Sequence, residues 1–291
     1  MAALSGRVDG EKLDRGISYL RSRGYGVVEA DNIRRVDGDF AGSDLERAEG
    51  YRALLRDPDV EAILFARGGW GAARTLGHLD PGEISKNPKI HLGGSDLASF
   101  FAFLRRRTGL ICFHGPMVAV DFASRPPDAE TAGSWEALLA GETPEFSIGS
   151  EDVVRPGSGA GPLVGGCLSI LASLEGTPDA LDTRGTILFW EDVNEEIYRL
   201  DRMLTQLRLA GRLDGLAGVI IGTLEEIHRH GKRDEAGVAS LLSDHFGSAG
   251  FPVVRNWPSG HGLRNRTLPL GARVRVDADR GLVRFEEPGV A

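Results

Sequence analysis

The 291-residue sequence has little cysteine, little lysine and no long apolar run, and each shortage excludes a class of protein. Its two cysteines, Cys112 and Cys167, lie in apolar surroundings; they are too few for a disulfide scaffold and lack the neighbours of a metal site. No apolar stretch approaches the roughly 18 residues of a membrane span. The first six residues carry neither the basic region nor the apolar core of a signal peptide. We therefore expect buried, reduced thiols, no metal site and a cytoplasmic location.

Positive charge is also scarce, which argues against two classes of partner. The 34 basic residues, of which four are lysines, stand against 42 acidic residues and leave a formal net charge of −8. Such a balance gives no support for a nucleic-acid partner or for an anionic membrane surface. The length suits one large domain or two ordinary ones, and 41% hydrophobic residues supply enough material for their cores.

The first third of the chain alternates helical and strand patterns, as a parallel α/β sheet requires. A helix with Leu13, Ile17 and Leu20 on one face ends at Gly24, and Ser43 with Glu46 forms a capping box before the next helix. We expect strands at 25–29, 62–65, 90–92 and 110–113, and further helices at 45–55, 71–79 and 97–107.

The composition of the sequence changes at residue 123. Residues 123–162 are rich in proline and glycine, which predicts a linker with one short helix near 134–140. Beyond it we expect helices at 168–174, 197–209 and 235–246, strands at 186–190 and 219–221, and a β-hairpin of 273–276 with 282–285. The pattern therefore predicts an N-terminal domain (1–122), a linker (123–162) and a C-terminal domain (163–291).

Ser95 is the first candidate for chemistry. It follows Gly93 and Gly94 at the end of an expected strand and precedes an expected helix, so the chain can turn sharply and lift the hydroxyl above the sheet edge. The free N–H groups at the helix start would face a developing oxyanion. Serine at such a place is equally a favoured helix N-cap. Position 97 is leucine, so the usual Gly-x-Ser-x-Gly pattern is not met.

Two further places combine turns with reactive side chains. Arg67 precedes a turn with three glycines in four positions, which lets a ligand approach the backbone; a tight turn without a ligand is the alternative. Glu191 ends the strand 186–190, and His261 lies between two glycines. A hydroxyl nucleophile needs a base within about 2.6–3.2 Å, oriented by a third group. Ser95, His261 and Glu191 would supply those roles, although a structural histidine and a solvated acidic run are the ordinary interpretations.

These residues resemble the LD-carboxypeptidase family of serine peptidases, which cleave muramoyl tetrapeptides and include the microcin C self-immunity peptidases. The resemblance runs in family order over nearly the whole chain. Its stretches are Ala66–Arg74, Gly94–Asp96, Phe113–Met117, Gly165–Ser173, Leu188–Asp192, Tyr198–Leu204 and Gly260–Gly262. It implies a flavodoxin-like, doubly wound N-terminal domain with the nucleophile and a β-rich α/β C-terminal domain with acid and base, the site lying between them.

The resemblance also implies a role for each residue. Ser95 matches the nucleophile, His261 the general base and Glu191 the acid that orients it, while the backbone N–H groups of Gly69 and Asp96 match the oxyanion hole. The implied reaction is acyl transfer to serine followed by hydrolysis, which needs no metal and no organic cofactor. A homodimer is implied in the same way.

The chain departs from the family in three places. The usual first strand, of the type Ile-Ala-Val-Val-Ala-Pro-Ser-Gly, is reduced to Ala2–Gly6, so either the start has been clipped or the true start lies upstream. Trp70 and Gly94 stand where the family often has tyrosine, and both could reshape the substrate pocket. We take Arg67 and Trp70 as candidates for substrate binding, Arg67 for the terminal carboxylate because of its position.

The function expected from the resemblance is release of the terminal D-alanine from murein tetrapeptide during cell-wall recycling. The alternative within the family is a microcin-C-type amidase that hydrolyses an aminoacyl-nucleotide. Between Met117 and Gly165 the only aromatics available to stack a base are Phe122, Trp135 and Phe146, which favours the tetrapeptide. A hypothesis from another class is a non-catalytic ligand-binding protein that holds phosphate at the Arg67 turn.

Overall fold

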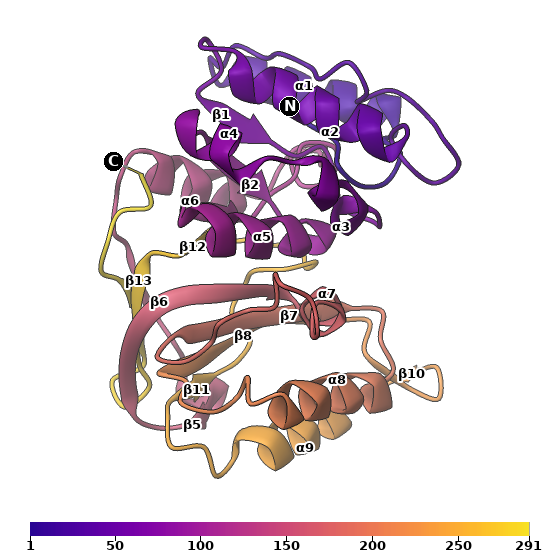
Figure 1. Ribbon diagram of the computed structural model, residues 1–291. Helices are drawn as coiled ribbons and strands as arrows, with labels where there is room; N and C mark the ends of the chain where they lie inside the picture. The colour runs from indigo at the N-terminus through magenta and orange to yellow at the C-terminus, as the bar shows by residue number, and fades with distance from the viewer. Residues whose placement is uncertain (291) are drawn as a thin grey trace.

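The N-terminal part of the computed structural model, which describes residues 1–290, is built on parallel strands (Figure 1). Strands β1 (Ala62–Leu64), β2 (Ile90–Gly93) and β3 (Cys112–His114) pair in that order. The helices of this part are α1 (Gly10–Ser22), α2 (Asp44–Arg56), α3 (Ala72–Thr75), α4 (Pro81–Lys86) and α5 (Ala98–Thr108). The alternation of strand and helix that the sequence predicted is confirmed.

Local signals set the ends of these helices. The Ser43 hydroxyl accepts from the Glu46 N–H at 3.3 Å, and the Glu46 carboxylate accepts from the Ser43 N–H at 2.9 Å, so the predicted capping box starts α2. After α1 the chain turns at Gly24, whose φ of +91° suits glycine.

The segment 25–29 was expected to form a strand, and that prediction is wrong. Its neighbour is the extended start of the chain, where Met1 donates to the Val28 carbonyl and accepts from the Ala30 N–H. Within residues 1–290 these two backbone hydrogen bonds are fewer than a ladder of strand length needs. On its other side the same start pairs with β1, because the Ala2 N–H donates to the Leu64 carbonyl at 3.0 Å.

The order of these segments across the sheet is that of a flavodoxin-like fold. Residues 28–30, the first residues of the chain, β1, β2 and β3 lie side by side, so the order reverses between the first residues and β1. Ligands of doubly wound sheets bind at the carboxyl ends of the strands near such a reversal. This edge carries the turns after β1 and β2.

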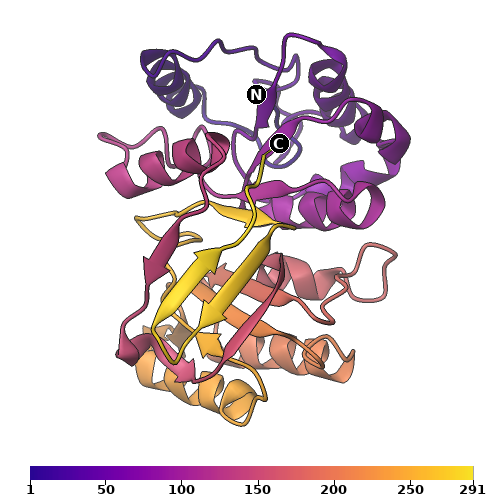
Figure 2. The ribbon, with the colours of Figure 1, turned by 90° about the vertical axis from the view of Figure 1, so that its left-hand side faces the viewer.

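The C-terminal part is built on a curled, mixed sheet of eight strands, in the order β4-β14-β13-β6-β7-β8-β11-β5. Figure 2 shows its antiparallel end, where β13 and β14 form the predicted hairpin. The strands are β4 (Glu145–Ser147), β5 (Val153–Arg155), β6 (Ser158–Cys167), β7 (Ile187–Val193), β8 (Gly218–Glu225), β11 (Val253–Val254), β13 (Arg273–Asp277) and β14 (Leu282–Phe285). Helices α7 (Leu168–Ser173), α8 (Ile197–Leu209) and α9 (Glu235–Phe246) begin and end within a residue of their predicted bounds.

The segment 123–162 contributes to both parts of the molecule. Helix α6 (Ala129–Leu139) buries Trp135 in the apolar cluster of the N-terminal sheet, and β4, β5 and the first residues of β6 join the C-terminal sheet. The exact division of the chain at 122 and 163 stays a prediction. Within residues 1–290 no helix has the length and apolarity required to cross a membrane.

The two sheets are also joined by pairing and packing. Strand β12 (Leu268–Leu270), late in the chain, returns to pair antiparallel with β3. The apolar cluster that contains Phe65 and Phe100 continues into the C-terminal sheet through Phe189 and Trp257. The distance between residues at this junction is therefore fixed by both domains.

Candidate active site

Ser95 occupies a strained position at the carboxyl end of β2. Its φ is +59°, which is uncommon for a residue other than glycine and typical of functional sites. The cap positions of the following short 3₁₀ turn and of α5 are Gly94 and Leu97, so the N-cap interpretation of Ser95 does not hold. Gly68 lies close by, since a Cβ there would be 2.8 Å from Ser95 Oγ. The glycine turn after β1 thus packs directly on the serine.

The structure brings Ser95, His261 and Glu191 together. His261 Nε2 lies 3.0 Å from Ser95 Oγ, and His261 Nδ1 lies 2.7 Å from Glu191 Oε2. Glu191 is fully buried on β7, and a Cβ on Gly260 would lie 2.7 Å from its carboxylate. Glycine before the histidine therefore permits the close approach. A hydroxyl, an imidazole and a buried carboxylate in this order can move a proton from the hydroxyl to the imidazole.

The charges around His261 favour its protonated form. Burial alone would lower the pKa of the imidazole, but the hydrogen bond and charge of Glu191, followed by the charges of Asp192 and Asp121, raise it above the usual 6.5. An imidazolium that forms here is therefore stabilised relative to one in water. Neither Asp192, which ends a stretch that resembles the family, nor Asp121 was identified as a site residue, because the sequence does not show which acidic side chains face His261.

The two N–H groups assigned to an oxyanion hole lie in adjoining turns. A Cβ on Gly68 would be 3.2 Å from the Asp96 nitrogen, so the turn that contains Gly69 lies against the turn that contains Asp96. In the described part of the chain neither the Gly69 nor the Asp96 N–H donates to another backbone or side-chain group. Both donors remain available to a ligand.

Arg67 precedes the glycine turn of residues 68–71, and Trp70 is part of it. Arg67 donates to the carbonyl oxygens of Gly68 and Arg7, each at 3.2 Å, and has no carboxylate partner among residues 1–290. It lines a hollow of about 400 Å³ together with Asp9, Lys12, Arg15, Ala119, Val120, Ala123 and Ser124. Trp70 is 53% exposed. Among these side chains, the cationic hollow at Arg67 is the feature suited to an anionic group.

Asn265 is a supporting residue that sequence reasoning missed. Its Oδ1 accepts from the Gly260 N–H at 3.2 Å, its Nδ2 donates to Asp121 at 3.2 Å, and its N–H donates to the Thr131 hydroxyl at 2.9 Å. It thereby ties the turn that carries His261 to the N-terminal half of the chain. No local signal marks it, because its partners other than Ser259 and Gly260 are distant in sequence.

Two other motif residues are buried next to the site. The Cys167 thiol lies 3.6 Å from Asp192, and burial raises its pKa, which agrees with the predicted reduced, buried thiol. His114 is buried against Phe189, with ring centroids 4.9 Å apart, and burial lowers its pKa to about 3. His114 is therefore neutral near neutral pH.

Comparison with known proteins relates both halves of the chain to one family. The N-terminal domain of LD-carboxypeptidase matches residues 1–115, and its C-terminal domain matches residues 160–276. A probable murein peptide carboxypeptidase of Bacillus subtilis is 34% identical over 273 residues, which cover 92% of this chain and 85% of that protein. The microcin C7 self-immunity protein MccF of Escherichia coli is 27% identical, with 94% of this chain and 87% of that protein covered. The crystal structure of muramoyltetrapeptide carboxypeptidase from Oxalobacter formigenes has a TM-score of 0.87 and 30% identity, and the match covers 98% of this chain and 96% of that one.

Proposed function

The chain belongs to the LD-carboxypeptidase family, and we propose that it releases the terminal D-alanine from murein tetrapeptide in cell-wall recycling. The observation that carries the proposal is the contact of Ser95 with His261 at 3.0 Å and of His261 with Glu191 at 2.7 Å, at the junction of the two domains. We include in the proposal the cytoplasmic location expected from the sequence composition and the homodimer that the family resemblance implies.

In the proposed reaction Ser95 Oγ attacks the carbonyl carbon that precedes the D-alanine. Its proton passes to Nε2 of His261, while Glu191 holds the Nδ1–H and so keeps the accepting nitrogen toward the serine. The N–H groups of Gly69 and Asp96 donate to the oxygen as it becomes negative. Collapse of the tetrahedral intermediate transfers the proton to the leaving amine of D-alanine. A water molecule, deprotonated by His261, then hydrolyses the ester on Ser95.

We place the terminal carboxylate of the substrate at the cationic hollow. Arg67 reaches it from the glycine turn that also carries one oxyanion donor, and Lys12 and Arg15 face the same space from α1. These three cations form no ion pair within residues 1–290, in a protein whose net charge is −8. We expect Lys12→Gln to raise KM for the tetrapeptide with kcat unchanged. Arg21→Gln is the matched control, since Arg21 is an unpaired, exposed cation near the other end of α1.

Two synthetic tetrapeptides test the proposed function. We expect release of D-alanine from L-Ala-γ-D-Glu-diaminopimelyl-D-Ala and no reaction with the same peptide ending in L-alanine, measured by a chiral amino-acid assay. Inverting the last centre moves either the methyl or the carboxylate out of its place, and misplacement of about 1 Å costs roughly 100-fold in rate. Equal release of both alanines would indicate a general peptidase. Release of neither, with no labelling of Ser95 by a fluorophosphonate, would favour a binding protein.

The second candidate is an amidase acting on an aminoacyl-nucleotide, which the similarity to MccF favours. Stacking of a nucleobase would need an aromatic face, and the three aromatics between Met117 and Gly165 offer none. Phe122 and Trp135 are 1% exposed, and the guanidinium of Arg266 lies over the Phe146 ring, 4.0 Å from its centroid. Cleavage of an aminoacyl-nucleotide without cleavage of the tetrapeptide would reverse this preference.

A further inference from the structure

The carboxylate of Asp96 joins the turn that carries Ser95 to two other segments of the N-terminal domain. Its Oδ2 accepts from the Ser5 hydroxyl at 2.6 Å and from the Ala72 N–H at 2.8 Å, and the residue is 1% exposed. Ala72 is the first residue of α3, and the N-cap residue, Gly71, has no side chain to accept from it. Asp96 therefore supplies, from a different turn, the cap that this helix lacks.

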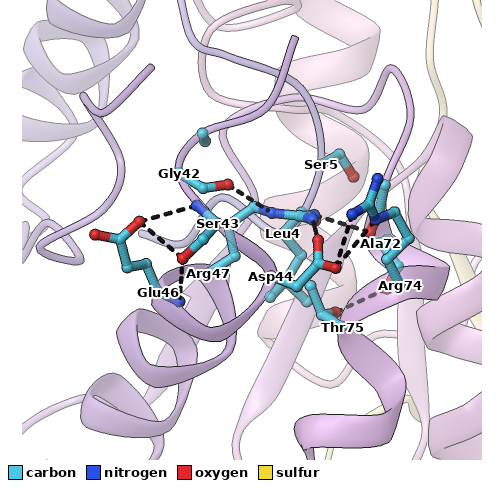
Figure 3. A network of polar contacts seen from close by, with 12 residues as sticks. Leu4, Ser5, Gly42, Ser43, Asp44, Glu46, Arg47, Ala72, Arg74 and Thr75 are labelled. Carbon is cyan, nitrogen blue, oxygen red and sulfur yellow. Dashed lines mark hydrogen bonds and ion pairs between the residues drawn. The ribbon is translucent and has the colours of Figure 1, made fainter. Parts of the chain in front are cut away.

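A buried cation holds the same glycine turn from the other side (Figure 3). Arg47 of α2 has no exposed surface. Its guanidinium forms an ion pair with Asp44 and donates to three backbone carbonyl oxygens, those of Leu4, Gly42 (3.2 Å) and Gly71 (2.8 Å). Its charge opposes the rise in the pKa of the Asp96 carboxyl that burial causes. Burying the guanidinium costs desolvation free energy, which its ion pair with Asp44 and its hydrogen bonds to the backbone offset.

Asp96 and Arg47 thus hold the two sides of one peptide group, because the Gly71 carbonyl and the Ala72 N–H belong to the same peptide bond. The turn that leads to this peptide group, residues 68–71, has no stiffness of its own. Three of its four positions from 68 to 71 are glycine, and Gly69 and Gly71 have φ of +107° and +120°, conformations that side chains other than glycine rarely adopt. Glycine is also required at position 68, because a Cβ there would lie 2.7 Å from Ser95 Cβ. Such a turn samples many conformations unless residues outside it hold it in place.

We infer that Asp96 and Arg47 are positioning residues that fix the separation of the two N–H donors proposed for the oxyanion. The inference rests on the proposed function. The N–H of Asp96 is one donor, and its carboxylate holds Ala72, three residues beyond the other donor, Gly69. Arg47 holds Gly71 between these points. Donors act through their fixed position in the transition state, so a displaced donor lowers kcat more than it changes substrate binding.

Steady-state kinetics of Asp96→Ala and Asp96→Asn test the inference. Alanine removes both hydrogen bonds. Asparagine keeps an oxygen that accepts from Ser5 and Ala72, but it loses the charge and places its amide nitrogen where Oδ1 has no hydrogen-bond partner among residues 1–290. We expect Asp96→Ala to lower kcat by roughly 100- to 1,000-fold, as loss of an oxyanion donor does, with KM within about threefold. Asp96→Asn should recover at least about a tenth of the wild-type kcat. A peptide phosphonate mimics the tetrahedral intermediate, so in each Asp96 variant its affinity should fall in parallel with kcat.

The control separates positioning from helix capping. Asp80 also caps a helix, since its carboxylate accepts from the Gly82 N–H at 2.8 Å at the start of α4, and it makes no hydrogen bond to either turn in residues 1–290. Asp80→Ala should therefore keep the wild-type kcat per folded molecule, with the folded fraction measured by circular dichroism.

A wild-type kcat per folded molecule in Asp96→Ala, or an equal loss in Asp80→Ala, would overturn the inference. Should Asp96→Ala not fold, Ser5→Ala removes one of the two hydrogen bonds and should lower kcat by several-fold; an unchanged kcat there would also overturn it. An inactive wild-type chain overturns the proposed function and the inference together, whereas an active wild type with an unimpaired Asp96→Ala overturns the inference alone.

Discussion

Replacing Glu191 with glutamine removes the negative charge next to Nδ1 of His261 and keeps the shape of the side chain. Both orientations of the amide are unfavourable. If its nitrogen faces His261, it donates to Nδ1 and leaves the imidazole proton on Nε2, which then cannot accept the proton of Ser95. If its oxygen faces His261, the amide nitrogen takes the place of Oε1, which has no hydrogen-bond partner among residues 1–290, and is left buried and unsatisfied.

The size of the effect follows from these contacts. Glu191 is fully buried and lies 2.7 Å from Nδ1, so its support of the imidazolium is not screened by water. We expect kcat/KM to fall by roughly 10² to 10⁴, or about 3–5 kcal/mol of transition-state stabilisation. Glu191 raises the pKa of His261 against the effect of burial, so its removal lowers that pKa. Since the neutral imidazole is the proposed base, the acid limb of the pH profile should move to lower pH even as the rate falls.

The assay is kcat/KM for D-alanine release from the tetrapeptide at about pH 5 to 9, for wild type and Glu191→Gln. Thermal unfolding of both proteins shows whether the variant is folded. A wild-type rate would refute the role of Glu191. An acid limb that moves to higher pH in a folded, slower variant would refute the electrostatic argument and leave orientation as its only effect.

Further outcomes follow from the same geometry. Ser95→Ala and His261→Ala should each lower kcat by several orders of magnitude in steady-state assays, because members of a triad act as a unit, with the fold intact by circular dichroism. Gly71→Ala should lower the thermal midpoint, since φ is +120° and the new Cβ would lie 2.9 Å from Nη1 of Arg47; an unchanged midpoint would contradict this reading. The pKa of His261 is raised on folding, so its protonation stabilises the protein fully below about pH 6.5, and this contribution is lost as pH rises through the folded-state pKa. The gap in thermal midpoint between wild type and His261→Ala should therefore narrow with rising pH.

Elements with local signals could be predicted from the sequence, and elements that depend on distant neighbours could not. The capping box of Ser43 and Glu46 and the bounds of α8 and α9 need only residues within one helix, and all three predictions are confirmed. The segment 25–29 has the composition of a strand, but it is joined to the neighbouring segment by two backbone hydrogen bonds with Met1 and forms no ladder. Strand formation is decided by that partner, which a local pattern does not contain.

The same division applies to the candidate site. Gly93 and Gly94 before Ser95, and the glycines on either side of His261, are local signals for sharp turns, and they identified the residues that the structure brings together. Asn265, Asp121 and Arg47 carry no such signal. Each is one of many similar residues in the sequence, and only the folded chain shows that it supports a turn of the site.

The distance between Ser95 and His261 is a distance between two domains, so the interface between them is part of the site. Three contacts set it. Strand β12 pairs Leu268 with His114, directly beside the end of β2. Asn265 ties the His261 turn to α6. Gly166 lies so close to Ala98 that a Cβ added to Gly166 would be 2.7 Å from the Cβ of Ala98. Because the interior is close-packed, an added methyl group at such a point moves one domain relative to the other. The small residues at this junction therefore serve the chemistry as well as the packing.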